Sequence, residues 1–333
     1  MKTYILIDTQ NLFMRIKHGV KAPDVEQQLA VALHIVFNSV KKVWDQFTGT
    51  HTVFCLEGRS WRKDIYAPYK ANRKIAANNR TAKEVEEDKL FFEVMDEFVK
   101  FIEEKTNCTV LRNSNAEADD MIARWIQLHP EDHHIIISSD SDFQQLIAPN
   151  VKIFNGIAGL LYTNIGIFDV NGKIAKNKQN KDLPIPDPEW FLFEKCMRGD
   201  DGDNVMSAFP GVRTKKLREA YEDRHNKGYS WNNLMLSKWT DHEGVDHRVK
   251  DDFERNQLLI DLKNQPADLL EKFDTTIYNA IITQPRKQVG LALMRFCNRH
   301  GLVKIEKSAA EYSPCLSSIY HGHLFAEKFQ TEL

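Results

Sequence analysis

The feature that most constrains the fold of this chain is a short apolar segment followed directly by an acid, which occurs three times. YILI runs into Asp8 and TVFCL runs into Glu57, while IIISS runs into Asp140, with Asp142 two residues later. Short apolar segments alternate with stretches of helical periodicity, and this alternation predicts a parallel sheet flanked by helices. Because ligands bind at the carboxyl ends of the strands in such a sheet, we expect these acids at one edge.

Four strands and three helices are predicted in the first half of the chain. The predicted strands are Tyr4–Ile7, Thr52–Leu56, Cys108–Leu111 and His134–Ile137. The predicted helices are Gln27–Phe47, Lys89–Glu104 and Glu117–Gln127. Residues 66–88 are basic and polar with little apolar periodicity, which predicts an exposed, mobile excursion. After about Ile167 the pattern changes to a polar loop rich in Lys and Asn, and then to helices only.

Two more acidic groups belong with the three strand ends. EADD opens a predicted helix, where the positive end of the helix dipole favours negative charge. Its acids are Glu117, Asp119 and Asp120. GDDGDN follows a helix that Gly199 can end, so that the acids lie on a tight loop. These acids are Asp200, Asp201 and Asp203. Each group taken alone is consistent with an ordinary cap, turn or loop.

Many acids in one pocket repel one another and raise one another's pKa unless they take up protons or bind cations. Oxygen ligands without His or Cys favour Mg²⁺ or Mn²⁺, and the number of acids indicates two or more ions. Two such cations can clamp a scissile phosphate, generate hydroxide from water and neutralise the leaving oxygen. If nine of the 47 Asp and Glu residues line this pocket, 38 acids remain against 45 Lys and Arg. That excess of positive charge suits a nucleic-acid partner.

Other classes of protein are excluded by absent motifs. The chain has no GxxxxGK[ST] loop, no GxSxG elbow and no HExxH helix. A haloacid-dehalogenase-type phosphatase would carry its acidic motif after the first strand, whereas DSD follows a later one. A calcium EF-hand is excluded because position 12 counted from Asp200 is Gly211 rather than Glu.

The spacing of the cysteines and the hydropathy of the chain indicate the cellular compartment of the protein. The five cysteines are far apart and form no CxxC, so neither a disulfide framework nor a zinc site is indicated. No apolar run reaches the roughly 20 residues that cross a bilayer, and the N-terminus lacks the features of a signal peptide. We therefore expect a soluble protein in a cytoplasm, with no membrane partner.

The motifs occur in the order Ile7-Asp8, CLEG, YKANR, EADD, SSDSDF, GDDGDN and FPGVRTKKL. This series resembles the 5′ nuclease family of flap endonucleases and 5′-3′ exonucleases, including its bacteriophage members such as phage ribonuclease H and phage 5′ exonuclease. The likeness runs from about Tyr4 to Asp261. It implies a PIN-like α/β core over residues 1–168 with a helical arch over about 66–105. It also implies a helical, duplex-binding lobe over 185–300 with a helix-hairpin-helix-like motif, followed by a tail of unknown role over 305–333.

The resemblance implies two metal sites. Around one metal it gathers Asp8, Glu57, Glu117, Asp119 and Asp120. Around a second it gathers Asp140, Asp142, Asp200 and Asp203, with Asp201 as a bystander. Which of these acids bind a cation directly and which bind through water is left open. Many relatives have Asp at position 57, so Glu57 reaches one methylene further.

The resemblance also implies contacts with nucleic acid. Lys70 and Arg73 in the arch would lie near the scissile phosphate and stabilise charge in the transition state, with a solvated basic face as the alternative. Further candidate contacts are Arg59, Arg62, Lys63, Tyr69, Gly211, Arg213, Lys215 and Lys216. Tyr69 could stack on a base or pack in the core. In relatives the hairpin of FPGVRTKKL also binds K⁺, but Arg213 replaces its second glycine, and direct phosphate contacts are then expected.

The function that these features predict is a structure-specific 5′ nuclease with two-metal-ion chemistry, acting in DNA replication or repair. It would combine 5′-3′ exonuclease and flap endonuclease activity with RNase H-type primer removal. Expected partners are branched, nicked or primed DNA and RNA–DNA hybrid with a 5′ end, together with single-strand-binding or other replication proteins. A monomer is expected, in the host cytoplasm for a phage member. The alternatives are a non-catalytic binder of branched DNA and a smaller RNA nuclease, which would lack the arch and the hairpin.

Overall fold

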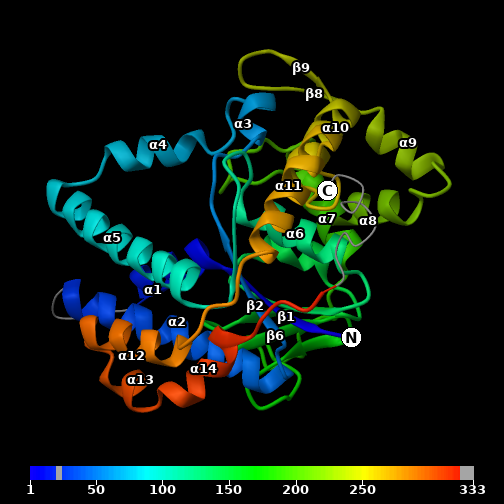
Figure 1. The fold of residues 1–333 in the computed structure, drawn as a ribbon. Coiled ribbons are helices and arrows are strands. Elements are labelled where there is room, and N and C mark those ends of the chain that lie inside the picture. The colour runs from blue at the N-terminus through cyan, green and yellow to red at the C-terminus, as the bar shows by residue number, and fades with distance from the viewer. Residues whose placement is uncertain (20–24, 323–333) are drawn as a thin grey trace. The chain divides into compact units, whose positions relative to one another are not determined.

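A computed structural model describes residues 1–19 and 25–322 of the chain (Figure 1). The chain forms two compact units. The first, here called the sheet unit, comprises Met1–Arg59, Thr81–Pro186 and Pro266–Leu333. The second, here called the helical unit, comprises Ser60–Arg80 and Asp187–Gln265. Within the described ranges no helix has the length and apolar character needed to span a bilayer.

The sheet unit contains a seven-stranded sheet in the order β3-β2-β1-β4-β5-β6-β7. Its strands are β1 (Thr3–Asp8), β2 (His51–Leu56), β3 (Thr109–Arg112), β4 (His133–Ile137), β5 (Val151–Asn155), β6 (Leu160–Thr163) and β7 (Gly166–Phe168). The strands from β1 to β5 pair in parallel, whereas β6 is antiparallel to both of its neighbours. The predicted parallel sheet and its four predicted strands are confirmed. The last three strands, VKIFN, LLYT and GIF, were not predicted; Lys152 and Asn155 interrupt the apolar run of β5, and β6 and β7 are separated only by a short turn.

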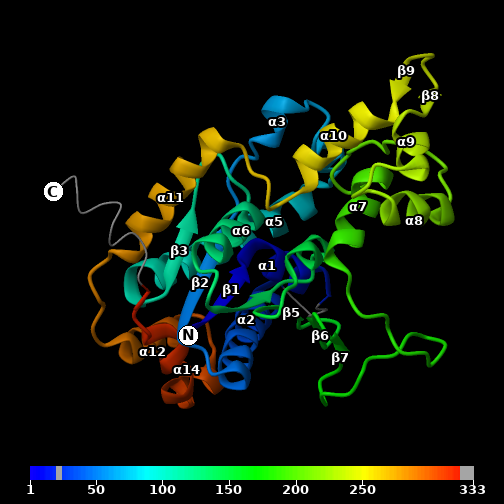
Figure 2. The ribbon, with the colours of Figure 1, turned by 90° about the vertical axis from the view of Figure 1, so that its right-hand side faces the viewer.

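Helices cover the sheet. Those of the sheet unit are α1 (Thr9–Gly19), α2 (Val25–Phe47), α5 (Ala82–Lys105), α6 (Ala118–Leu128), α11 (Ala267–Ile281), α12 (Val289–Arg299), α13 (Val303–Lys307) and α14 (Ala309–Ser317), with the 3-10 helix η1 (Ser141–Leu146). Ile5 and Ile7 of β1 pack into an apolar cluster with side chains of α2, α5, α12 and α14. Leu6 lies between them and points to the opposite face, because successive strand residues alternate. Helix α6 contacts β1, β2 and β3, and Figure 2 shows it alongside them.

The helices at the end of the described chain belong to the sheet unit, so the unit boundaries differ from the predicted ranges 185–300 and 305–333. Phe296 of α12 lies in the same apolar cluster as β1. The hydroxyl of Thr52 in β2 donates a hydrogen bond of 2.8 Å to the carbonyl of Cys315 in α14. Figure 1 shows α12 and α14 beside α2. These contacts with the core explain why the chain after residue 266 does not join the helical unit.

The helical unit is built around aromatic side chains. Its elements are α3 (Arg62–Ile65), α4 (Ala71–Asn78), α7 (Pro188–Arg198), α8 (Thr214–Glu222), α9 (Tyr229–Met235), β8 (Lys238–Thr240), β9 (Asp246–Arg248) and α10 (Val249–Ile260). Phe193 packs with its ring centroid 5.4 Å from that of Tyr221 and 5.6 Å from that of Phe253. The expectation of helices only is wrong, because β8 and β9 form a hairpin. Its turn is set by Asp241, whose carboxylate accepts two backbone amides, and by Gly244 with φ of 82°.

Helix α5 begins at Ala82, seven residues before the predicted start at Lys89. Its N-terminus is held by a capping box, in which the hydroxyl of Thr81 accepts the amide of Glu84. The carboxylate of Glu84 in turn accepts the amide of Thr81 at 2.7 Å. A capping box satisfies amides that a helix end leaves without partners. Residues 66–88 are therefore largely helical, since α4 occupies the earlier part of this range.

Candidate functional site

The sheet unit collects acids at the carboxyl edge of its parallel strands. Asp8 ends β1, Glu57 follows β2, and Asp140 lies three residues beyond β4. Asp8 is buried, with 5% of its surface exposed. Its carboxylate accepts a hydrogen bond of 2.9 Å from the hydroxyl of Ser138 and one of 3.3 Å from the amide of Asn11. These two donors fix the orientation of Asp8 at the end of the strand.

Burial and neighbouring carboxylates shift the pKa of Asp8. Burial raises the pKa of Asp8 to about 8, and the negative charges of Glu57 and Asp140 act in the same direction. The hydrogen bonds from Ser138 and Asn11 oppose the rise but do not cancel it. A buried carboxylate surrounded by other carboxylates is costly unless a proton or a cation neutralises it. The edge of the sheet is therefore a place where a divalent cation would relieve repulsion.

A second cluster lies at the N-terminus of α6. Glu117, Asp119 and Asp120 each offer a carboxylate oxygen, and the three oxygens lie within 4.8 Å of one another. Glu117 is 4% exposed and Asp120 is 0% exposed. The carboxylate of Asp120 accepts the amide of Glu117 at 3.1 Å, and that of Asp119 accepts the amide of Asp120 at 2.7 Å. Closely spaced carboxylate oxygens are the donors that hard divalent cations such as Mg²⁺ and Mn²⁺ prefer, so these residues fit a metal.

Backbone hydrogen bonds join the loop after Glu57 to the loop before Glu117. The amide of Gly58 donates to the carbonyl of Ala116 at 2.9 Å, next to both acids in the sequence. A Cβ atom at position 58 would lie 1.9 Å from the carbonyl oxygen of Asn113, so the close approach of the loops requires glycine. Gly58 is a positioning residue that the sequence analysis missed, although its place directly after a strand-end acid was a usable signal.

Asp140 and Asp142 open the 3-10 helix η1. The carboxylate of Asp140 accepts the amide of Asp142 at 2.9 Å, which is the usual geometry of an N-cap. Asp140 is exposed and Asp142 is half-buried. The structure thus places all seven predicted metal ligands of the sheet unit at strand ends or helix starts.

The remaining predicted ligands, Asp200 and Asp203, belong to the helical unit. Gly199 ends α7 with φ of 76°, and a Cβ there would lie 2.3 Å from the carbonyl oxygen of Val205. Asp200 forms an ion pair of 2.8 Å with Lys195. Burial alone raises the pKa of Asp200, but the hydrogen bond and charge of Lys195 and the amides of the loop outweigh it and leave the pKa below its usual value. Lys195 is another residue that the sequence analysis missed.

Asp203 lies among the residues of the YKANR motif. The hydroxyl of Tyr69 donates to its carboxylate at 2.9 Å, and the guanidinium of Arg73 donates at 2.7 Å. The ammonium of Lys70 lies 3.5 Å from the same carboxylate. The backbone amide of Lys70 also donates to the carbonyl of Asp203 at 2.8 Å. The two predicted phosphate ligands are thus held next to one predicted metal ligand.

Two predicted nucleic-acid contacts are not supported by the structure. Arg62 is 1% exposed, and its Nε donates a hydrogen bond of 2.7 Å to the carbonyl of Leu259. Its guanidinium lies 4.7 Å from the ring centroid of Trp61. Tyr69 is 3% exposed and packs in an apolar cluster of the helical unit. Both side chains stabilise the unit from inside, and a buried ring has no face for a base. The sequence shows their charge and aromaticity but not their burial.

The other predicted contacts lie at or near the surface. Arg59 is exposed and Lys63 is half-buried. Gly211 is exposed with φ of 70° and sits in the turn before α8, which Arg213 precedes as an exposed N-cap residue. Lys215 and Lys216 follow in the first turn of α8. Lys215 lies 3.9 Å from Glu219, and Lys216 lies 4.9 Å from the ring centroid of Phe209.

The fold and the acid clusters together define an α/β protein whose sheet edge carries closely spaced carboxylates that could hold divalent cations. Residues 3–177 match the model of the 5′-3′ exonuclease N-terminal, resolvase-like domain, and the chain belongs to this family. It is 26% identical over 218 residues to the flap endonuclease of Escherichia phage T5, with 65% of this chain and 68% of that protein covered. It is 27% identical over 280 residues to DNA polymerase I of Rhizobium leguminosarum, with 81% of this chain covered. The match spans only 24% of that polymerase.

Solved structures show the same fold. A crystal structure of the bacteriophage T5 flap endonuclease in a complex with DNA and metal ions superimposes with a TM-score of 0.59 at 21% identity. The match covers 84% of this chain and 99% of that one. The phage enzyme with zinc bound gives a TM-score of 0.57 at 22% identity. The predicted fold class is thereby confirmed.

Proposed function

We propose that this protein is a structure-specific 5′ nuclease that hydrolyses phosphodiester bonds as a 5′-3′ exonuclease and flap endonuclease. The observation that carries the proposal is the set of seven acids at the carboxyl edge of one parallel sheet, in a chain of the 5′-3′ exonuclease family. A protein that only binds nucleic acid gains nothing from acids that face a polyanion. Their presence favours catalysis over the non-catalytic alternative.

The residues proposed to hold a first divalent cation are those at the strand ends and the start of α6. They are Asp8, Glu57, Glu117, Asp119 and Asp120. Asp140, Asp142, Asp200 and Asp203 stay proposed ligands of a second cation. Mg²⁺ is the proposed ion, with Mn²⁺ as a substitute, because the donors are all carboxylates. When bound, such ions supply hydroxide at neutral pH and stabilise charge on the phosphate and the leaving oxygen.

The side chains around these acids have their own roles in the proposal. Ser138 and Asn11 hold Asp8 in one orientation, so the carboxylate needs no rearrangement to accept a cation. Arg73 is 61% exposed and offers donors to a phosphate oxygen. Lys70 adds a second positive charge beside it. Fixed cations that face developing negative charge lower the barrier of phosphoryl transfer.

The proposed substrates are branched, nicked or primed DNA and RNA–DNA hybrids with a 5′ end, including RNA primers. The turn around Gly211 and the exposed Arg213 and Lys215 support a direct contact with duplex phosphates, and K⁺ at this hairpin stays the alternative. We propose a monomer that works with single-strand-binding or other replication proteins in a cytoplasm.

A labelled 5′ flap tests the proposal. With Mg²⁺ we expect endonucleolytic release of the flap, and with EDTA we expect none. Asp120→Asn should reduce the rate at least about 100-fold, since it removes a buried ligand charge. Asp268→Asn is the matched control, because Asp268 is an exposed acid in the first turn of α11. Cleavage in EDTA, or an Asp120→Asn enzyme as fast as the wild type, would refute the assignment.

A further inference from the structure

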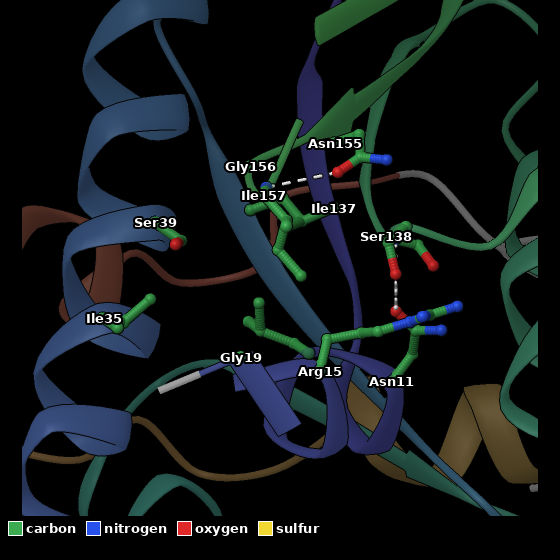
Figure 3. A pocket seen from close by; sticks show the side chains of 12 residues that line it. Asn11, Arg15, Gly19, Ile35, Ser39, Ile137, Ser138, Asn155, Gly156 and Ile157 are labelled. Carbon is green, nitrogen blue, oxygen red and sulfur yellow. Dashed lines mark hydrogen bonds between the residues drawn. The ribbon is translucent and has the colours of Figure 1, made fainter. Parts of the chain in front are cut away.

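A cavity of about 240 Å³ opens beside the acids of the sheet unit (Figure 3). Its walls come from α1, α2, the segment after β4 and the turn after β5. Helix α1, the segment after β4 and the turn after β5 follow the carboxyl ends of strands that run in parallel, so these three walls lie at the carboxyl edge of the sheet. Ser138 lines the cavity and also donates its hydroxyl hydrogen bond to Asp8. The cavity and the candidate metal site thus share a residue.

One side of the cavity is polar and carries a positive charge. Asn11 and Arg15 lie one helical turn apart on α1, so their side chains share a face. The side-chain oxygen of Asn11 accepts the hydroxyl of Ser139 at 2.8 Å and its amide at 3.2 Å, which fixes the position of this helix face. Figure 3 shows Arg15 extending toward Asn11 and Ser138. A guanidinium in this place can bind a phosphate oxygen next to the acids.

The rest of the lining is mainly apolar. Leu12 and Ile137 are buried, and Ile35 and Ile157 complete the wall. The turn that carries Ile157 is held by Asn155, whose side-chain oxygen accepts the amides of Ile157 at 3.2 Å and of Ala158 at 3.0 Å. An apolar wall of this size suits one flat, weakly polar group rather than a second phosphate. The cavity therefore offers a positive side chain for a phosphate and an apolar surface for a planar ring.

We propose that this cavity binds one nucleotide of the cleaved strand, adjacent to the bond that is cut. The base lies against Ile35 and Ile157, the side chains of the apolar wall that are not buried, and the phosphate lies on Arg15. The inference rests on the proposed nuclease function and assigns a substrate subsite next to it. A nucleotide held there keeps the neighbouring phosphodiester in register with Asp8. Such positioning raises the rate of a reaction that depends on alignment.

An abasic scan tests the base site. Flap substrates carry a single abasic residue at successive positions of the 5′ strand on each side of the scissile bond, and kcat/KM is measured for each with Mg²⁺. The wild type should lose about 10-fold at one position and little elsewhere, because base contacts are each worth about 1 to 3 kcal/mol. Equal rates for all abasic substrates would overturn the proposal.

Two variants locate the effect in the cavity. Ser39→Phe places a ring in the cavity without changing charge, and should lower kcat/KM about 10-fold for the intact flap but not for the substrate that lacks the critical base. Val31→Phe on the exposed side of α2 is the control, since Val31 is 39% exposed. If Ser39→Phe cleaves the intact flap like the wild type, or loses the same factor on every substrate, the base does not occupy the cavity.

Arg15→Gln tests the phosphate site by a readout that does not need cleavage. The anisotropy of the labelled flap in EDTA gives the dissociation constant, and the variant should bind about 3-fold to 10-fold more weakly with a shallower salt dependence. Arg286→Gln, at an exposed arginine, should bind like the wild type. Unchanged binding would remove Arg15 from the site. If the wild type cuts no flap, the proposed nuclease function is refuted. The binding measurement in EDTA still shows whether Arg15 binds the flap.

Discussion

At the scale of single residues, the close approach of two loops depends on the absence of a side chain at Gly58. Gly58→Ala would press a methyl group against the carbonyl of Asn113, 1.9 Å away, so the backbone must move. We expect the free energy of unfolding to fall by about 1 to 3 kcal/mol. The rate of flap cleavage should fall further, because Glu57 moves with the loop.

Urea unfolding and single-turnover cleavage measure the two effects of Gly58→Ala. Gly290→Ala is the control, because a Cβ at that position in α12 would lie 3.6 Å from the hydroxyl oxygen of Ser313, an ordinary van der Waals contact. If Gly58→Ala folds and cuts like the wild type, the joined loops do not position the acids.

Arg73 gives a second prediction at this scale. Its guanidinium is largely exposed, so Arg73→Ala should change the free energy of unfolding by less than about 1 kcal/mol, the usual worth of a surface ion pair. Its proposed role toward the phosphate predicts a fall in kcat of about 100-fold. Arg286→Ala should leave kcat unchanged. A fall in stability large enough to explain the lost activity would mean that Arg73 serves the fold through Asp203.

The sequence predicted the positions of the acids in the fold better than it predicted which side chains surround them. An acid directly after an apolar strand is visible in the sequence, and parallel pairing fixes where it lies. Burial is not visible, because it depends on side chains distant in the chain. Arg62 illustrates this, since its partner Leu259 is 197 positions away. For the same reason the ion pair of Asp203 with Arg73 could not be read from either motif.

At the scale of elements, the amino edge of the sheet carries three buried histidines. Burial lowers the pKa of His51, His129 and His134 to about 4 each. His51 is bonded to the carbonyl of Ser318 at 3.0 Å, and His129 to the hydroxyl of Tyr320 at 2.8 Å. The unfolded chain takes up protons near pH 6.5, whereas the folded chain does so only near pH 4. Stability present above pH 6.5 is therefore lost as the pH falls toward 4.

The measurement is the urea midpoint between pH 7 and pH 4.5. Each histidine should contribute a slope of about 1 kcal/mol per pH unit in this range. His51→Asn should be less stable at pH 7 but show a shallower slope. His242→Gln should keep the slope of the wild type, because the side chain of His242 is 85% exposed. An equal slope in His51→Asn would show that His51 is not held neutral in the folded state.

The helices and strands that could be predicted are those whose apolar residues recur at the spacing that packing against the core requires. Strands β1, β2 and β4 each contain a continuous apolar run, as parallel strands buried on both faces require. Helix α14 was not predicted, since its nine residues contain Pro314 and show weak amphipathicity. It is helical because its apolar side chains Tyr312 and Leu316 are packed in the core cluster. Tertiary burial, rather than local propensity, stabilises such an element.

At the scale of the whole molecule, the sheet unit is assembled from three separate stretches of chain and the helical unit from two. Sequence patterns run along the chain and predict contiguous domains, so they miss a unit that the chain leaves and re-enters. The family match ends at residue 177 and does not include the C-terminal helices. Only their packing shows to which unit they belong. Stability of the sheet unit thus depends on helices α12 to α14 as well as on the segments that carry the acids.

The acids make a final prediction about the molecule as a whole. Folding gathers carboxylates that are far apart in the unfolded chain, so the metal-free protein is destabilised by their repulsion. A cation that binds only the folded state stabilises it by about 2.7 kcal/mol at 100 times its dissociation constant. Millimolar Mg²⁺ should therefore raise the melting temperature relative to EDTA, by about 5 °C for a chain of this size.

Asp8→Asn separates repulsion from a general effect of salt. It removes a carboxyl that must either take up a proton or keep its charge when folding buries it, and it keeps an oxygen for the hydroxyl of Ser138, so in EDTA the variant should melt above the wild type. In Mg²⁺ its gain should be smaller than that of the wild type, because one ligand is gone. Differential scanning calorimetry at constant ionic strength measures both. A wild type with the same melting temperature in Mg²⁺ and in EDTA would contradict preformed metal sites, since ligands already gathered by the fold must bind the ion more tightly than the unfolded chain does.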